Sequence, residues 1–283
     1  MEEYISDNSL YIRSKNNSMI NRKMIGRVLG MLLFIELGMF LLCAGVSAGY
    51  GESDYKYFLY TCIINAVVGG LLLLYGRGAE NKMSRRDGYC VVTLSWVFFT
   101  FFGMLPFYFS GSIDTITNAF FETMSGFTTT GATILNDIES LSHGMLFWRS
   151  LTQWIGGLGI VFFTIAILPI FTTGGVQLFS AESTGVTHDR THPKINVMAK
   201  WLWTIYLVLT VSETVLLMFG GMSLFDAICQ SFATTATGGY STKQNSISYW
   251  NSPYIEYVVA IFMIVSSINF RLGVGMQIVQ EIF

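Results

Sequence analysis

Two short stretches rich in threonine and glycine have the residue types that bind a dehydrated cation. The first is Ser125-Gly-Phe-Thr-Thr-Thr-Gly-Ala-Thr133, and the second runs from Ala233 to Thr242. Glycine accepts positive φ, so successive carbonyl groups can face one axis, and threonine adds hydroxyl oxygens. Rings of such oxygens replace the water shell of K⁺. One such loop could equally serve tight packing, but two matched loops favour ion binding.

The predicted ion-binding residues are Thr128, Thr129, Thr130, Gly131, Ala132, Thr235, Ala236, Thr237, Gly238 and Gly239. Within this set, we expect potassium at Thr129, Thr130, Gly131, Ala236, Thr237 and Gly238. Neither loop carries an acidic residue, so selectivity would depend on carbonyl dipoles and on the C-terminal ends of the preceding helices.

The two loops lie in an internal repeat. Ala119 matches Ala227, Glu122 matches Gln230, Thr123 matches Ser231 and, with a gap of one residue, Thr130-Gly131 matches Thr237-Gly238. Each unit is expected to be a spanning helix, a half-helix, a Thr/Gly loop and a second spanning helix. Because both units are expected to have the same orientation in the membrane, they indicate parallel repeats related by an axis along the membrane normal. We expect Glu122 and Gln230 to support the loops, although Glu122 could equally be a packed, partly hydrated acid.

Composition places these loops in a membrane protein. The chain has 283 residues, of which 52% are hydrophobic and 12% charged, against about 25% charged in soluble domains. Its mean hydropathy is +0.52. The net charge of −2 gives no reason to expect nucleic acid as a partner. Motifs of serine hydrolases, zinc proteases and P-loop enzymes are absent, so we expect no enzyme and no organic cofactor.

The expected fold is therefore an all-α integral membrane protein with six spanning helices, at about 25–49, 57–76, 88–109, 147–171, 197–220 and 253–275. Half-helices are expected at 115–127 and 223–234. The predicted organisation is a cytoplasmic segment (1–24), a two-helix extension (25–80), a first pore repeat (81–175), a cytoplasmic linker (176–196) and a second pore repeat (197–283).

Basic residues predict the orientation. Thirteen of the 16 Lys and Arg residues fall on one side of this arrangement, and only Lys56, Arg149 and Lys243 fall on the other. Positive charge stays in the cytoplasm. Both termini are therefore expected in the cytoplasm, and the loops on the outer side of the plasma membrane.

Several polar residues lie within or beside the predicted spans. Arg149 could pair with Glu122 or Asp137, or reach the lipid headgroups. Glu36, Glu213 and Glu256 have no partner that the sequence identifies, and acids inside a membrane are functional candidates. The four cysteines, Cys43, Cys62, Cys90 and Cys229, are widely spaced and are expected to be buried apolar residues.

Other features leave two interpretations open. Gly156, Gly157 and Gly159 could serve close helix packing or a bend below the loops, and Pro169 ends or kinks the same span. His188 and His192 are expected in a solvated cytoplasmic loop, which could contact a gating partner.

The chain resembles the membrane subunits of the Trk/Ktr/HKT potassium transporter superfamily, the Trk type most closely. The matching stretches are 125–133, Trp148-Arg-Ser-Leu-Thr-Gln-Trp-Ile-Gly-Gly157 continuing to Leu168-Pro169, 233–242 and Ile268-Asn269-Phe270. The resemblance implies K⁺ uptake across the bacterial inner membrane, through a pore of four such repeats. It also implies a cytoplasmic nucleotide-binding gating ring as partner. Transport could be passive or coupled, as in symport.

Only two of the four repeats are present, so the chain is expected to be the N-terminal half of such a transporter. Alternatively, two chains pair as a homodimer, because a two-fold axis along the membrane normal preserves orientation. A third alternative is a non-conducting relic that associates with a full-length subunit. In each case membrane lipid surrounds the helices.

Overall fold

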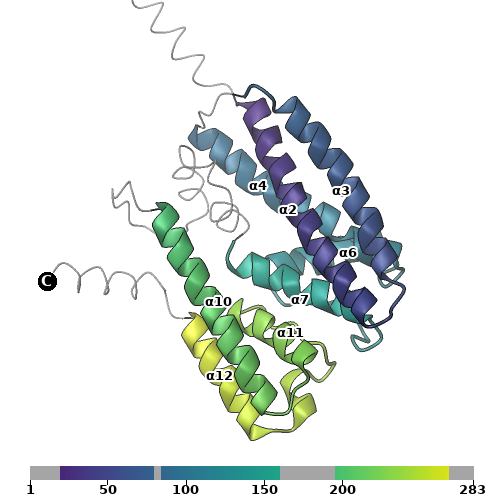
Figure 1. Cartoon of the computed structure of the whole chain (residues 1–283), viewed down its shortest axis with the longest axis vertical. Coiled ribbons are helices and arrows are strands. Elements are labelled where there is room, and N and C mark those ends of the chain that lie inside the picture. The colour runs from purple at the N-terminus through teal and green to yellow at the C-terminus, as the bar shows by residue number, and fades with distance from the viewer. Residues whose placement is uncertain (1–19, 80–83, 160–194, 268–283) are drawn as a thin grey trace, which may run out of the picture.

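The computed structural model describes residues 20–79, 84–159 and 195–267, and every regular element in these ranges is a helix (Figure 1). The predicted all-α fold is confirmed. Pro169, His188, His192 and the motif at 268–270 lie outside the described residues, so the interpretations placed on them stay predictions.

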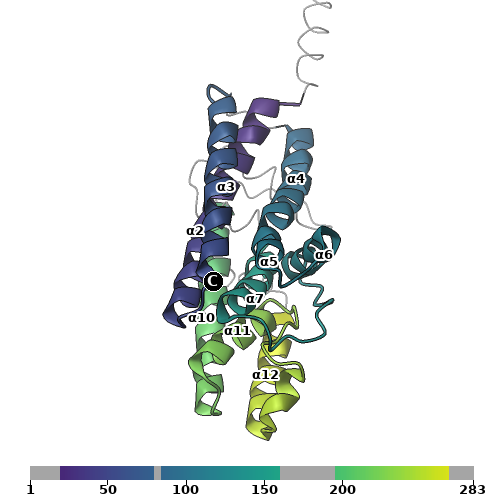
Figure 2. The same ribbon diagram turned by 90° about the vertical axis from the view of Figure 1, so that its right-hand side faces the viewer.

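The first two helices form a closely packed pair. Helix α2 spans Arg22–Gly49 and α3 spans Tyr55–Tyr75, and they lie side by side in both views (Figures 1 and 2). Small residues allow this approach, because a Cβ added to Gly30 would lie 2.8 Å from the carbonyl oxygen of Gly69. On α3, the exposed residues Leu59, Ile63, Val67 and Leu71 recur every four positions, which forms an apolar stripe suited to lipid.

The first unit with a half-helix follows. It consists of α4 (Arg85–Gly103), α5 (Leu105–Phe109), the half-helix α6 (Ile116–Phe127) and α7 (His143–Gly157). The span predicted at 88–109 is one helix interrupted between Gly103 and Leu105. Pro106 cannot donate a backbone hydrogen bond, so it cannot continue α4 without a break. At the same place the Gly103 carbonyl accepts a hydrogen bond from Trp148 Nε1 at 2.8 Å.

The second unit repeats the same order. It contains α10 (Ile195–Phe219), the half-helix α11 (Leu224–Thr235), the short helix η2 (Ser246–Trp250) and α12 (Pro253–Ser267). Both half-helices begin at a hydroxyl cap, because Thr115 accepts from the amide of Asn118 and Ser223 from the amide of Asp226. The predicted order of helix, half-helix, Thr/Gly loop and helix is therefore found in both units, as far as the described residues extend.

Among the described residues, four helical stretches are long and apolar enough to cross a membrane: Arg22–Gly49, Tyr55–Tyr75, Arg86–Phe109 and Leu202–Phe219. They correspond to four of the six predicted spans. The other two predicted spans lie only partly within the described residues. In the span predicted at 147–171, α7 begins earlier, at His143, and the structure describes the chain as far as Gly159. In the span predicted at 253–275, the structure describes α12 as far as Ser267.

Helix α7 is the shared element of the core. It packs against α2, α6 and the second half-helix α11. Its residue Trp148 is fully buried, with ring centroids 4.6 Å from Phe40 of α2 and 6.0 Å from Phe127 of α6. Side chains on α7 can therefore reach the loops of both units.

Candidate functional site

The two Thr/Gly loops have the same backbone hydrogen bonds. At the end of α6, the amides of Thr128, Thr129 and Thr130 donate to the carbonyls of Met124, Gly126 and Ser125. At the end of α11, the amides of Ala236, Thr237 and Gly238 donate to those of Phe232, Thr234 and Ala233. We name residues 128–133 the first loop and residues 236–241 the second loop.

This pattern corrects the predicted match between the loops. Each residue of the first loop corresponds to the residue 108 positions later, with no gap, as Glu122 does to Gln230. Thr130 therefore corresponds to Gly238, and Gly131 corresponds to Gly239. The gapped match of Gly131 with Gly238 was wrong because it followed residue identity, whereas backbone conformation defines the register.

Positive φ angles occur at the same two places in each loop. They are +53° at Thr129 and +74° at Gly131, and +55° at Thr237 and +83° at Gly239. A left-handed conformation costs a residue other than glycine roughly 1–2 kcal/mol. Strain of this kind persists only where the surrounding structure imposes it, and it is typical of functional sites.

The carbonyl oxygens of these loops divide into two groups. No described group donates a hydrogen bond to the carbonyls of residues 128–131 or 236–239. The Ala132 carbonyl, in contrast, accepts from Ser125 Oγ at 2.6 Å and from the Tyr240 hydroxyl at 3.3 Å. Because a carbonyl oxygen has two lone pairs, that of Ala132 is already occupied by protein donors.

The loops are in direct contact with each other. A Cβ added to Gly131 would overlap the carbonyl group of Gly238, and one added to Gly238 would overlap the side-chain amide of Gln153 on α7. Gln153 Oε1 also accepts from the amide of Tyr240 at 3.0 Å. Neither glycine can therefore be replaced without displacing the other loop or α7.

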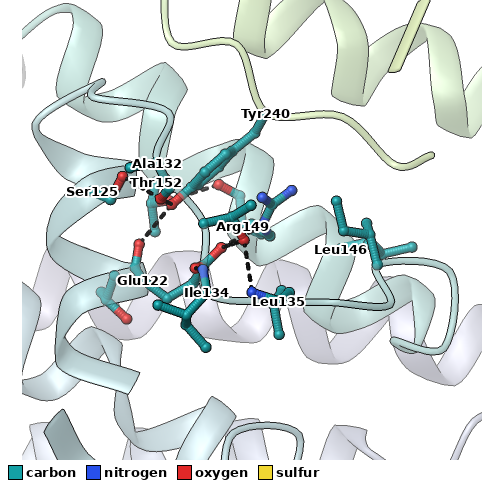
Figure 3. Close-up of polar contacts among 12 residues, drawn as sticks. Glu122, Ser125, Ala132, Ile134, Leu135, Leu146, Arg149, Thr152 and Tyr240 are labelled. Carbon is teal, nitrogen blue, oxygen red and sulfur yellow. Dashed lines mark hydrogen bonds and ion pairs between the residues drawn. The ribbon is translucent and has the colours of Figure 1, made fainter. Parts of the chain in front are cut away.

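Glu122 on α6 holds the first loop from behind (Figure 3). Its Oε1 accepts from Thr133 Oγ1 at 2.9 Å and from Arg149 Nε at 2.7 Å, and its Oε2 accepts from the amide of Ile134 at 3.0 Å. The carboxylate is fully enclosed, with its side chain 0% exposed. Glu122 is therefore a packed acid whose hydrogen bonds reach the first loop and the residue after it.

Arg149 on α7 connects this carboxylate to the second loop. Its Nη1 donates to the Ser241 carbonyl at 3.0 Å, and its guanidinium lies 3.6 Å from the centre of the Tyr240 ring. Tyr240 donates in turn to the Glu122 backbone carbonyl at 2.8 Å, and burial raises the pKa of its hydroxyl, which keeps it a neutral donor. Arg149 is buried, so pairing with Glu122 is confirmed and contact with lipid headgroups is wrong.

Gln230, the counterpart of Glu122, makes no comparable network. Its Nε2 donates to Thr234 Oγ1 at 3.3 Å, within the same half-helix, and its Oε1 has no partner among the described residues. Nearby, Thr235 Oγ1 donates to Glu213 Oε2 at 3.4 Å. No described bond joins Gln230 to the second loop, which Gln153 and Arg149 hold instead.

Sequence reasoning missed Gln153, Tyr240 and Ser125 as supports of the loops. A signal for Gln153 was present, because it follows Arg149 by four residues and so shares its helix face. Gly156 and Gly157 of the same helix pack closely, since a Cβ on Gly156 would overlap the Phe127 carbonyl. This contact supports the packing interpretation of these glycines.

The described acids and cysteines outside the loops do not form a metal site. The described residues contain no cluster of three His, Cys, Asp or Glu side chains that could hold a metal. All four cysteines are free thiols. Glu256 is exposed on α12, while Glu36 is buried and bonded to Asn65.

Comparison with known proteins gives consistent results. The family model TrkH, described as a cation transport protein, matches residues 55–278. The Trk system potassium uptake protein TrkH of Escherichia coli K12 is 42% identical over 250 residues, which is 88% of this chain and 52% of that protein. The protein of the same name from Halomonas elongata is 37% identical over 252 residues, which is 88% of this chain and 52% of the Halomonas protein.

A solved structure agrees with the sequence comparison. The crystal structure of the potassium transporter TrkH from Vibrio parahaemolyticus matches with a TM-score of 0.75 and 35% identity, over 90% of this chain and 51% of that one. The chain thus spans about half the length of the relatives it matches.

Proposed function

Because the chain belongs to the TrkH family of cation transport proteins, we propose that it takes part in K⁺ uptake across the cell membrane. The observation that carries this proposal is the pair of touching loops whose carbonyls, at 128–131 and 236–239, accept no hydrogen bond from the described residues. Such oxygens can replace the water shell of a K⁺ ion.

Electrostatics supports cation binding at this position. Helices α6 and α11 both end at the loops, and the C-terminal end of a helix carries partial negative charge. Glu122 lies behind the first loop and is paired with Arg149. In this proposal the Ala132 carbonyl supports the first loop, and Thr235 is the last residue of α11, with its hydroxyl donated to Glu213. The proposed ion ligands are therefore the carbonyls of residues 128–131 and 236–239.

Two loops form half of a closed cation shell. In this proposal two further loops of the same kind complete it, from a longer protein or from a second copy of the chain. Both termini lie in the cytoplasm of a bacterium, the protein lies in the inner membrane, and a cytoplasmic nucleotide-binding ring gates the path. The chain has no catalytic activity, and transport is passive or coupled to a second ion.

The test is ⁸⁶Rb⁺ uptake by a host that lacks its own K⁺ uptake systems and expresses this chain. Gly131→Ser is the inactive variant, because it places a side chain against the Gly238 carbonyl. Gly111→Ser is the matched control, since Gly111 also has a positive φ, of +70°, but no atom lies within 4 Å of an added Cβ. Uptake that only Gly131→Ser abolishes would support conduction by paired chains.

Absence of uptake from protein shown to be in the membrane would contradict conduction by this chain alone. Co-purification with a tagged full-length Trk subunit would then favour the role of an interaction partner. If the chain neither conducts nor associates with such a subunit, the proposed function is wrong.

A further inference from the structure

A buried acid and a buried amide face each other between the first two helices, away from the Thr/Gly loops. Glu36 lies in the middle of α2 and Asn65 in α3, and both are 0% exposed. Asn65 Nδ2 donates a hydrogen bond to Glu36 Oε2 at 3.0 Å. The other oxygen of each side chain, Glu36 Oε1 and Asn65 Oδ1, has no partner among the described residues.

This arrangement lacks one donor. A buried oxygen without a donor costs about 1–3 kcal/mol, and an ionised carboxylate in a membrane costs more. A neutral carboxyl group and a carboxamide form a ring with two hydrogen bonds, N–H to one carboxyl oxygen and O–H to the amide oxygen. The first bond is present, and the two oxygens without partners are those that the second bond would join.

We propose that Glu36 is an intramembrane proton-binding site, in which a proton on Oε1 is donated to Asn65 Oδ1. One proton then removes the charge of the carboxylate and satisfies both oxygens. No described cation could serve instead, because the basic side chains on the elements around α2 have other partners or are exposed.

On α2 itself, Arg22 and Lys23 are exposed, and Arg27 is engaged in another interaction. Further ionisable groups lie on the elements packed against α2. Arg149 of α7 pairs with Glu122 of α6, His143 of α7 pairs with Glu52, and Asp87 caps α4. On α3, Cys62 is close to Glu36 but donates to the Leu37 carbonyl, and Lys56 and Tyr75 are exposed. On α4, Arg86 and Tyr89 are exposed and Cys90 is partly exposed. Cys43 of α2 is a buried free thiol.

The proposed site lies against the first unit, which consists of α4, α5, α6 and α7. A Cβ added to Gly103, where α4 ends, would lie 3.2 Å from Glu36 Oε1 and 3.0 Å from the Thr123 side chain of the half-helix α6. Loss of the proton would leave Glu36 Oε1 charged and without a donor at this junction. The proton therefore stabilises the packing of the α2–α3 pair on the helices that position the first loop.

Infrared difference spectroscopy of the protein in lipid bilayers tests the proposal. At neutral pH the wild type should show the C=O band of a protonated carboxyl group, and Glu36→Gln should lose it. Glu256→Gln is the matched control, because Glu256 is exposed and should leave the band unchanged. Asn65→Leu, which removes the acceptor, should shift the band to higher frequency. Identical bands in the wild type and in Glu36→Gln would overturn the proposal.

Thermal unfolding against pH gives a second readout that does not depend on transport. The unfolded chain releases the Glu36 proton at a lower pH than the folded protein does, so the wild type should lose stability as the pH rises through the range in which only the folded protein holds it. Glu36→Gln should lose less, since its N–H replaces the O–H donor. Parallel curves would overturn the proposal. A carboxylate band that responds to Na⁺ or K⁺ instead of pH would also overturn it, in favour of a bound cation.

Discussion

Arg149 of α7 binds the Glu122 carboxylate through Nε at 2.7 Å and the Ser241 carbonyl through Nη1 at 3.0 Å. One buried side chain thus connects the support of the first loop with the backbone of the second. The geometry of an ion path between the loops would depend on this connection, because the two loops come from different repeats.

Removal of either partner of this ion pair should strongly destabilise the protein. Arg149→Gln or Glu122→Gln leaves an uncompensated buried charge, which costs about 3–5 kcal/mol. The double variant should lose less than the sum of the two, because it leaves no such charge. Unfolding in detergent micelles, analysed as a double-mutant cycle, measures the coupling. Additive effects would show that the pair contributes nothing as a pair.

Gly131→Ala should impair ion selectivity more than Gly239→Ala. The two positions correspond in the repeat and both have positive φ, so backbone strain is similar, at roughly 1–2 kcal/mol. Only at Gly131 would the new Cβ also overlap the other loop, whereas Gly239 has no atom within 4 Å. The K⁺ over Na⁺ preference, measured in an assembly that conducts, checks this. Equal effects would mean that the contact between the loops is unimportant.

Tyr240→Phe should have a moderate effect. The variant loses the hydrogen bonds to the carbonyls of Glu122 and Ala132 but keeps the aromatic ring under Arg149. A lost hydrogen bond costs about 1 kcal/mol. Tyr240→Leu should cost more, because it also removes the cation–π contact. The comparison of both variants in thermal unfolding separates the hydroxyl from the ring, and equal losses would contradict a role for the ring.

Gly156→Ala should destabilise the protein although alanine favours helix. The added Cβ would overlap the Phe127 carbonyl at the end of α6. Gly38→Ala on α2 is the matched control, because no atom lies within 4 Å of its added Cβ, and it should gain up to about 1 kcal/mol. Melting temperatures that change in the same direction would contradict the proposed close contact between α7 and α6.

The elements were predictable because their signals are local. Apolar length identified the four described helical stretches that are long enough to span a membrane. The hydroxyl caps at Thr115 and Ser223 mark the starts of both half-helices. The similarity of the two Thr/Gly stretches indicated the repeat and the candidate ion ligands. None of these inferences required knowledge of which residues touch across the fold.

The structure alone decided the register and the partners. Gly131 corresponds to Gly239 because hydrogen bonds and φ angles, which residue identity does not encode, are the same there. The pairs Glu122–Arg149 and Glu36–Asn65 join residues 27 and 29 positions apart on different helices. The sequence by itself determined that this is a helical membrane protein with two Thr/Gly loops. Which buried polar groups bond to one another was decided only by the packing of α7 and α2 against the other helices, because such bonds depend on the distances between helices.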